Sequence, residues 1–76
     1  MELISTHTDP DTDERYAVIR DEHGDEDLVK PGAVYWASGF GHAEVARVHH
    51  DGLTFVIYGD GEYHFFRRWA SVYNPR

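Results

Sequence analysis

Two Asp-Gly dipeptides, Asp51-Gly52 and Asp60-Gly61, constrain the fold of this chain more than any other feature of its sequence. Asp-Gly is a strong signal for a tight β-hairpin turn. The residues between the two dipeptides, LTFVIYG, predict a strand with Leu53, Phe55 and Ile57 on one face and Thr54, Val56 and Tyr58 on the other. Further short strands are expected at Arg15–Arg20, Ala33–Ser38, His42–His50 and Glu62–Phe66.

The alternation slips within the His42–His50 run. In a regular strand, Ala43 and Val45 would lie on one face and Val48 on the opposite face. A β-bulge at this point would restore the pattern and would bend the sheet, as a small barrel requires.

The C-terminal segment, RRWASVYNPR, leaves two structures open. Trp69 and Tyr73 are spaced for a short helical turn near residues 67–72, whereas a final strand would turn Val72 inward. With either ending, the sequence predicts a mainly β fold. We expect a small antiparallel, strongly bent sheet or partly open barrel of about five strands.

The length of 76 residues suits a single domain, residues 1–76, with a thin core. The chain has no cysteine, so disulfides and thiolate metal sites are excluded, and its eleven aromatic residues are expected to supply much of the buried area. No apolar run reaches the roughly 18 residues of a membrane span, and the start MELISTHTDPD lacks the features of a secretory signal. We therefore expect a cytoplasmic protein, and the thin core leaves a homodimer open.

Acidic charge is concentrated in the first third of the chain. Residues 1–27 carry ten acidic side chains against two arginines, a net charge of −8, whereas residues 28–76 carry four against five basic ones, a net charge of +1. The domain thus divides into an acidic N-terminal segment, 1–27, and a nearly neutral, small-barrel-like core, 28–76. We expect no direct binding to nucleic acid and none to an anionic membrane, because both need a basic face.

The sequence offers no pattern for a catalytic, metal or cofactor site. A calcium loop starting at Asp9 would need Gly at its sixth position and Glu at its twelfth, where the chain has Glu14 and Arg20. The six histidines include no pair at the usual zinc spacing, and His42 and His49 are seven residues apart. The serines lack the context of an enzyme nucleophile. We therefore expect no catalytic residues, no metal and no cofactor, and a protein that is not an enzyme.

The second half of the chain has a characteristic layout: KPGAVYW, then AEVARVHHDGLTFVIYGDGEYHFF, then RRWASVY. It resembles small uncharacterised phage and prophage proteins and, more generally, Src-homology-3-like small barrels. The resemblance covers residues 30–73. It depends on Pro31, Gly32, Val34, Trp36, Asp51, Gly52, Phe55, Trp69 and Tyr73. What it implies is a small-barrel fold and a mobile-element origin, and it implies no activity.

The acidic segment is the best candidate for a functional site. A halophilic coat would cover the whole surface, and disorder, which would suit residues 1–14, does not suit the strand expected at 15–20. In an extended segment, alternate residues share a face about 6.6 Å apart, so residues 9–13 and 21–27 would form rows of carboxylates that coarsely imitate DNA phosphates. The predicted partner-binding residues are Asp9, Asp11, Asp13, Glu14, Asp21, Glu22, Asp25, Glu26 and Asp27.

From this charge pattern we expect a non-enzymatic acidic interaction protein that occludes the basic DNA- or RNA-binding surface of a host protein or complex. In its character (tiny, acidic and similar to phage proteins) it is like the anti-CRISPR inhibitors and DNA mimics that phages encode, and its place would then be the host cytoplasm. The alternative is a structural or regulatory small-barrel module that binds a partner through an aromatic groove, with acids that only keep it soluble.

Overall fold

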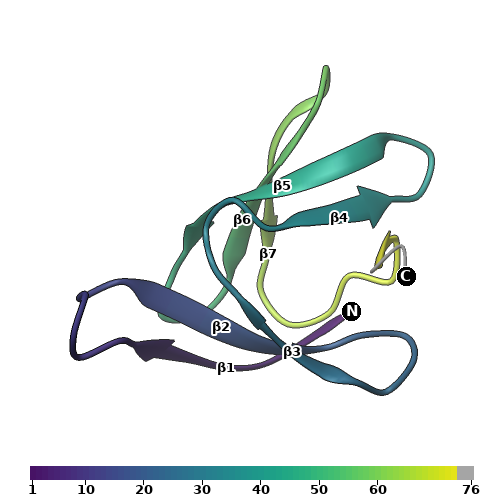
Figure 1. Ribbon diagram of the computed structural model, residues 1–76. Helices are drawn as coiled ribbons and strands as arrows, with labels where there is room; N and C mark the ends of the chain where they lie inside the picture. Colours follow the sequence, from purple (N-terminus) through teal and green to yellow (C-terminus); the bar gives the residue numbers. More distant parts are fainter. Residues whose placement is uncertain (74–76) are drawn as a thin grey trace.

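The structure, a computed structural model, describes residues 1–73 and consists of β-strands, turns and loops (Figure 1). Eight strands follow one another along the chain: β1 (Glu2–Thr8), β2 (Arg15–Arg20), β3 (Glu26–Val29), β4 (Val34–Ala37), β5 (Gly41–Val48), β6 (Leu53–Ile57), β7 (Gly61–Phe65) and β8 (Val72–Tyr73). The mainly β fold expected from the sequence is confirmed. Residues 1–73 form eight strands, where about five were expected.

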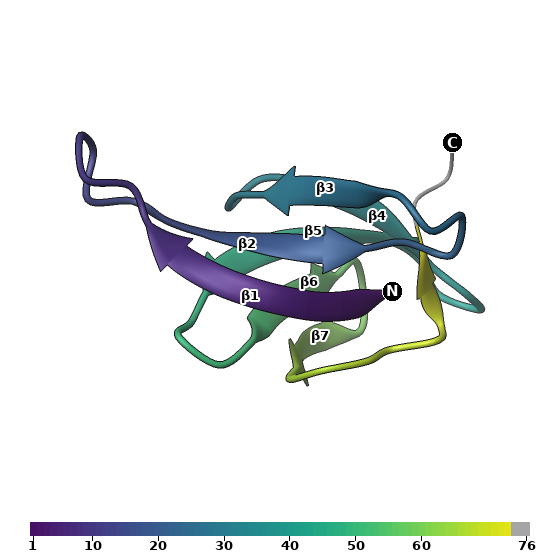
Figure 2. The same cartoon turned by 90° about the horizontal axis from the view of Figure 1, so that it is seen from below.

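The strands form two antiparallel sheets. The first is a three-stranded meander with the order β1-β2-β3. The second has the order β7-β6-β5-β4-β8 and curls strongly, as half of a barrel does. Figure 2 shows β1, β2 and β3 lying across the second sheet. The strongly bent sheet expected from the sequence is therefore the second sheet, and the acidic segment supplies most of the first.

Backbone hydrogen bonds join β1 to the segment that follows β7. The Leu3 amide donates to the Arg67 carbonyl at 2.7 Å, and Glu2 forms an isolated bridge with Arg68. After β3, the chain runs directly into the pairing of β4 with β5, which the bonds from the Gly32 amide to the Val45 carbonyl and from the Val45 amide to the Ala33 carbonyl, each at 2.8 Å, extend. The bonds of β1 hold the three-stranded sheet against the half-barrel, so the acidic segment is an integral part of the fold.

The core lies between the sheets and is aromatic at its centre. Phe55 is fully buried and meets Tyr35, Phe65 and Trp69 edge-on, with ring centroids 6.1, 6.2 and 5.8 Å away. Such edge-to-face pairs stabilise a core beyond the area that they bury. Aliphatic side chains surround this cluster: Ala17, Ile19, Val29, Ala37, Ala43, Val45, Leu53, Ile57 and Val72. The aromatic residues thus contribute the large buried side chains that the composition suggested.

The predicted β-bulge is confirmed. The register of β5 against β6 shifts between Val45 and Arg47, so Ala46 is the extra residue. The bulge restores the inward direction of the apolar side chains on both sides of it and helps β5 to bend. A second shift, between Leu3 and Ser5 of β1, was not predicted.

The helical turn considered near residues 67–72 is wrong, and residues 1–73 contain no helix. The Arg67 carbonyl accepts from the Leu3 amide, and the Trp69 amide donates to the Met1 carbonyl at 3.1 Å, so the N-terminal residues hold residues 67–69 in place. A turn closed by the bond from the Val72 amide to the Trp69 carbonyl, at 3.2 Å, then leads into β8. The alternative, a final strand with Val72 buried, is confirmed by β8. Disorder is excluded for residues 2–8, because β1 pairs with β2 along its length.

Candidate interaction surface

The first acidic turn comprises Asp9, Asp11, Asp13 and Glu14, in the loop between β1 and β2. Asp9 shapes this loop, since its Oδ1 accepts the Asp11 amide at 2.8 Å and its carbonyl accepts the Asp13 amide at 2.8 Å. Asp13 has a φ of 60°, a left-handed conformation that Asp and Asn tolerate better than most residues. Asp11, Asp13 and Glu14 are exposed. The loop therefore presents three carboxylates to solvent at its tip.

The second acidic turn comprises Asp21, Glu22, Asp25, Glu26 and Asp27, between β2 and β3 and at the start of β3. Asp21 is only 6% exposed, and its Oδ1 accepts the amides of His23 at 2.9 Å and Asp25 at 3.0 Å. Its carboxylate therefore holds the turn in shape. Glu22 and Asp25 are exposed and are the members best placed to meet a partner.

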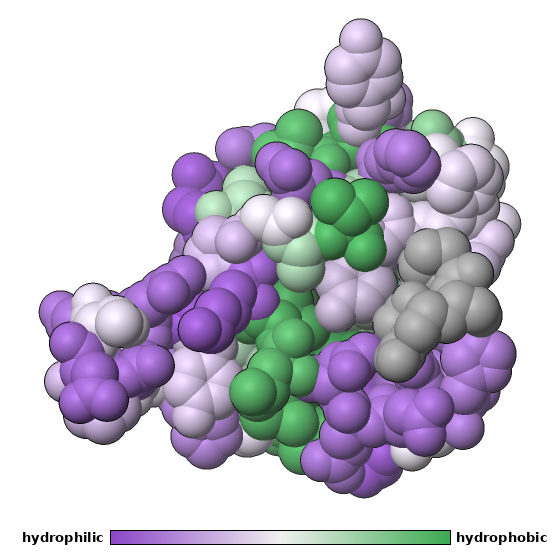
Figure 3. All heavy atoms as spheres, in the orientation of Figure 1, coloured by the Kyte–Doolittle hydropathy of each residue, from purple (hydrophilic) through white to green (hydrophobic). Residues whose placement is uncertain are grey.

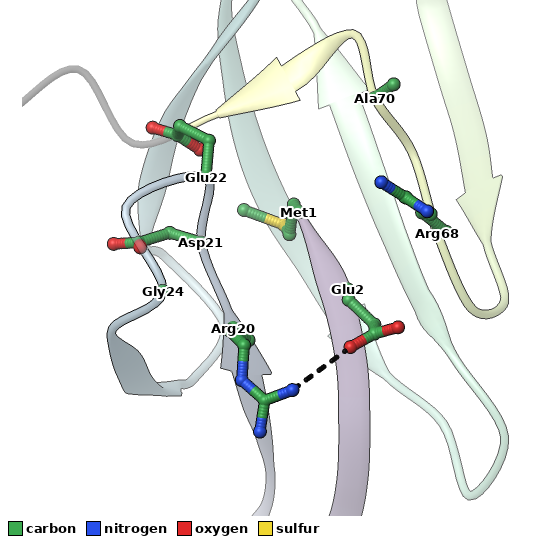
Figure 4. A pocket seen from close by; sticks show the side chains of 8 residues that line it. All are labelled: Met1, Glu2, Arg20, Asp21, Glu22, Gly24, Arg68 and Ala70. Carbon is green, nitrogen blue, oxygen red and sulfur yellow. Dashed lines mark hydrogen bonds and ion pairs between the residues drawn. The ribbon is translucent and has the colours of Figure 1, made fainter.

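Arg20 stands beside the second acidic turn and partly neutralises it. Its Nη2 lies 3.1 Å from Glu26 Oε2, and its Nη1 lies 3.5 Å from Glu2 Oε1. Figure 4 shows Arg20 and Glu2 directed toward each other from neighbouring strands. All three side chains are about half exposed, so these pairs contribute little to stability. Glu26 is thus already engaged within the chain.

The rows of carboxylates expected from an extended segment are not formed. Residues 9–14 and 21–25 lie in turns and loops, so their side chains do not alternate between two faces. The acids instead gather into two clusters at opposite ends of β2 (Figure 2), whose six residues span about 20 Å. Figure 3 shows the same arrangement as two hydrophilic lobes, at the lower left and lower right, with hydrophobic atoms between them.

An open hollow of about 430 Å³ borders the second acidic turn (Figure 4). It is lined by Met1, Glu2, Arg20, Asp21, Glu22, Gly24, Arg68 and Ala70. Carboxylates and two guanidinium groups share this lining, so it offers ion pairing to groups of either sign. The hollow extends the charged surface of the second acidic turn toward β1.

The sequence did not single out a further exposed surface, on the solvent side of the five-stranded sheet. We call this the outer face, and it comprises Val34, Trp36, His42, Glu44, Val56 and Tyr58. Its large side chains are well exposed, Tyr58 by 89%. A groove of about 260 Å³ is lined by all of these residues except Trp36. The sequence does carry a signal for this face in VYWA, the sequence of β4. All four side chains are apolar or aromatic, although only alternate ones reach the core.

Two of the six histidines share a buried partner. His49 Nε2 lies 2.7 Å from Thr54 Oγ1, and His64 Nδ1 lies 3.0 Å from the same oxygen, which belongs to a fully buried residue. A hydroxyl has one proton, so it donates to one imidazole and accepts from the other. No group of three or more potential metal ligands comes together within residues 1–73.

In the hairpin between β6 and β7, the side chain of Tyr63 has a shifted pKa. The Tyr63 hydroxyl donates to Asp60 Oδ2 at 2.6 Å. This hydrogen bond to a carboxylate, with smaller effects from desolvation and from the charge of Asp60, raises the pKa of Tyr63 above the ordinary tyrosine value. The contact stabilises the hairpin in its neutral-tyrosine form.

Comparisons of the chain with protein-family models, with curated proteins and with solved structures find no match. Within residues 1–73, no helix is long and apolar enough to cross a membrane. A function must therefore be inferred from the two acidic turns and the outer face.

Proposed function

We propose that this chain is a non-enzymatic binding protein that docks its acidic three-stranded sheet on a basic, nucleic-acid-binding surface of another protein. The observation that carries the proposal is the pair of exposed carboxylate clusters at the two ends of β2. Their exposed members are Asp11, Asp13, Glu14, Glu22 and Asp25. Within residues 1–73, no arginine or lysine forms an ion pair with any of these five. Glu22 Oε1 lies 3.5 Å from His23 Nε2, a contact that is an ion pair only when His23 is protonated.

The spacing of the clusters suits a surface that binds a nucleic-acid backbone. One DNA strand carries a phosphate every 3.4 Å of helix axis, so the roughly 20 Å along β2 corresponds to about six phosphates. A strip of lysines and arginines that follows a backbone of that length would meet one acidic turn near each end. The long-range field of residues 1–27, with a net charge of −8, would also steer the chain toward such a strip.

A protein that occupies a nucleic-acid-binding surface is an inhibitor of whatever that surface does. We include in the proposal that the chain is phage-encoded and acts in the host cytoplasm on a defence complex, as anti-CRISPR proteins and DNA mimics do. This part is supported by the resemblance of residues 30–73 to small phage and prophage proteins and by the small size and acidity of the chain.

Affinity capture tests the proposal. The chain is immobilised and exposed to bacterial lysate at about 100 mM salt, beside a neutralised control in which the five exposed carboxylates become amides (D11N, D13N, E14Q, E22Q and D25N). The control keeps Asp9 and Asp21, which shape the turns. We expect the native chain to retain nucleic-acid-binding proteins and to release them at about 300 mM salt. The neutralised control should retain none. Equal retention by the control would contradict the proposal.

A further inference from the structure

We infer that the outer face of the five-stranded sheet is a separate docking site, which receives an arginine side chain of a partner protein at Glu44. This inference does not rest on the function proposed above, because the outer face and the acidic turns belong to different sheets. It can hold or fail whether or not the acidic turns meet a basic surface.

Glu44 lies between two valines in a cross-strand row that ends at Glu62 of β7. Val34 of β4 pairs with Glu44 of β5, and Glu44 pairs with Val56 of β6. Since paired residues on one face of a sheet have Cβ atoms about 5 Å apart, the two valines flank the Glu44 side chain. They are 52% and 37% exposed. The carboxylate therefore rises from a groove with aliphatic walls.

An aromatic row lies beside it. Trp36 pairs with His42, and their rings meet edge-on with centroids 5.7 Å apart. The Tyr58 amide donates to the His42 carbonyl at 3.4 Å, which places Tyr58 on the other side of His42 from Trp36. The groove thus has a carboxylate between its valines and exposed aromatic rings along one border.

No cation within the described residues, 1–73, pairs with this carboxylate. Arg47, the arginine of β5, is engaged by Glu62 at 3.2 Å. An unpaired carboxylate between apolar walls and aromatic rings is complementary to a side chain that has a long hydrocarbon stem and a cationic head.

Arginine fits this groove better than other ligands. The groove, at about 260 Å³, is smaller than the roughly 300–1,000 Å³ of small-molecule sites and suits one long side chain. A guanidinium group stacks on aromatic rings and forms paired hydrogen bonds with a carboxylate, whereas an ammonium is more strongly hydrated. Apolar neighbours of that arginine would lie on Val34 and Val56.

A peptide titration tests the inference. The probes are Ac-Gly-Val-Arg-Val-Gly-NH2 and the same peptide with citrulline, which has the shape of arginine without its charge. Binding is followed through the amide NMR signals of the full chain at about 50 mM salt. We expect the arginine peptide to shift the signals of Val34, Glu44, Val56 and Tyr58. The citrulline peptide should bind at least about fivefold more weakly.

A matched pair of variants separates Glu44 from general acidity. Glu44→Gln and Asp51→Asn each remove one exposed carboxylate, the first on the outer face and the second in the turn between β5 and β6. We expect Glu44→Gln to weaken the binding of the arginine peptide about fivefold, to the level of the citrulline peptide, and Asp51→Asn to change its affinity less than about twofold. Equal binding of the two peptides, equal effects of the two variants, shifts confined to the acidic turns, or no shifts at all would overturn the inference.

Discussion

The two acidic turns should contribute to partner binding independently, because β2 holds them apart. One variant, D11N/D13N/E14Q, removes three charges from the first acidic turn. A second, E22Q/D25N, removes two from the second acidic turn. A third combines them. Amides replace carboxylates of nearly the same shape, and asparagine suits the left-handed conformation at position 13. All five side chains are exposed, so the fold should tolerate the changes.

The distance between the two acidic turns sets the expected interaction energy between their charges. Two unit charges about 20 Å apart in water interact by about 0.2 kcal/mol, and a Debye length of about 8 Å reduces this to about 0.02 kcal/mol. The six charge pairs between the two sets then couple by about 0.1 kcal/mol in total. An exposed ion pair contributes about 0.2–1 kcal/mol, so the first variant should weaken binding roughly 3- to 150-fold and the second roughly 2- to 30-fold.

The assay is the dissociation constant of each variant for a captured basic partner, measured by fluorescence anisotropy at about 150 mM salt. The losses of binding free energy in the two single-turn variants should add in the combined variant to within about 0.5 kcal/mol. Melting temperatures should stay unchanged or rise, since like charges have been removed. If only one of the two single-turn variants lost affinity, or if the losses of binding free energy departed from additivity by more than about 1 kcal/mol, the two-cluster arrangement would be refuted.

Three further outcomes are expected inside the fold. Gly52→Ala should lower the free energy of unfolding in urea by about 1–3 kcal/mol, because a Cβ at this position would clash with the Phe65 carbonyl oxygen; unchanged stability would contradict this close approach. Thr54→Val should lower the free energy of unfolding by about 1–3 kcal/mol, since the imidazoles of His49 and His64 lose their shared hydroxyl. Thr54→Ser, which keeps the hydroxyl, should be less destabilising than Thr54→Val. Asp60→Asn should lower the pKa of Tyr63 toward the ordinary value, as followed by NMR titration of its ring. The raised pKa in the native chain means that the stabilising contact is present below the ordinary tyrosine pKa and is lost as the pH rises through the folded value.

The central strands were predictable because each has a local signal. Alternation in β6, the Asp-Gly turns and the parity slip at Ala46 all depend on neighbours in sequence. Strands β1 and β3 were not predicted, since ELISTHT and EDLV hold few apolar residues and are stabilised by pairing with β2. Gly52 lies at the expected turn, but glycine is required there for a different reason than turn conformation. Its φ is not positive, and it is needed because the backbone of Phe65 passes close by.

The candidate site was predictable in composition and not in shape. Charge counts identified the acidic segment, but only the fold shows that β2 divides it into two clusters. The buried role of Asp21 depends on the turn conformation, which brings the amides of His23 and Asp25 to its carboxylate. Glu44 looked like an ordinary strand residue, because its apolar neighbours come from β4 and β6. Such cross-strand neighbours are set by register, which the sequence leaves open.

The most direct test of the central claim is competition between this chain and DNA for one captured partner. A fixed amount of partner is titrated with labelled DNA at several concentrations of the chain. If the acidic turns occupy the nucleic-acid-binding surface, the apparent Kd for DNA should rise in proportion to the chain concentration, without a limit, and the neutralised chain should have no effect. A ternary complex of partner, DNA and chain, with DNA affinity unchanged, would contradict the account.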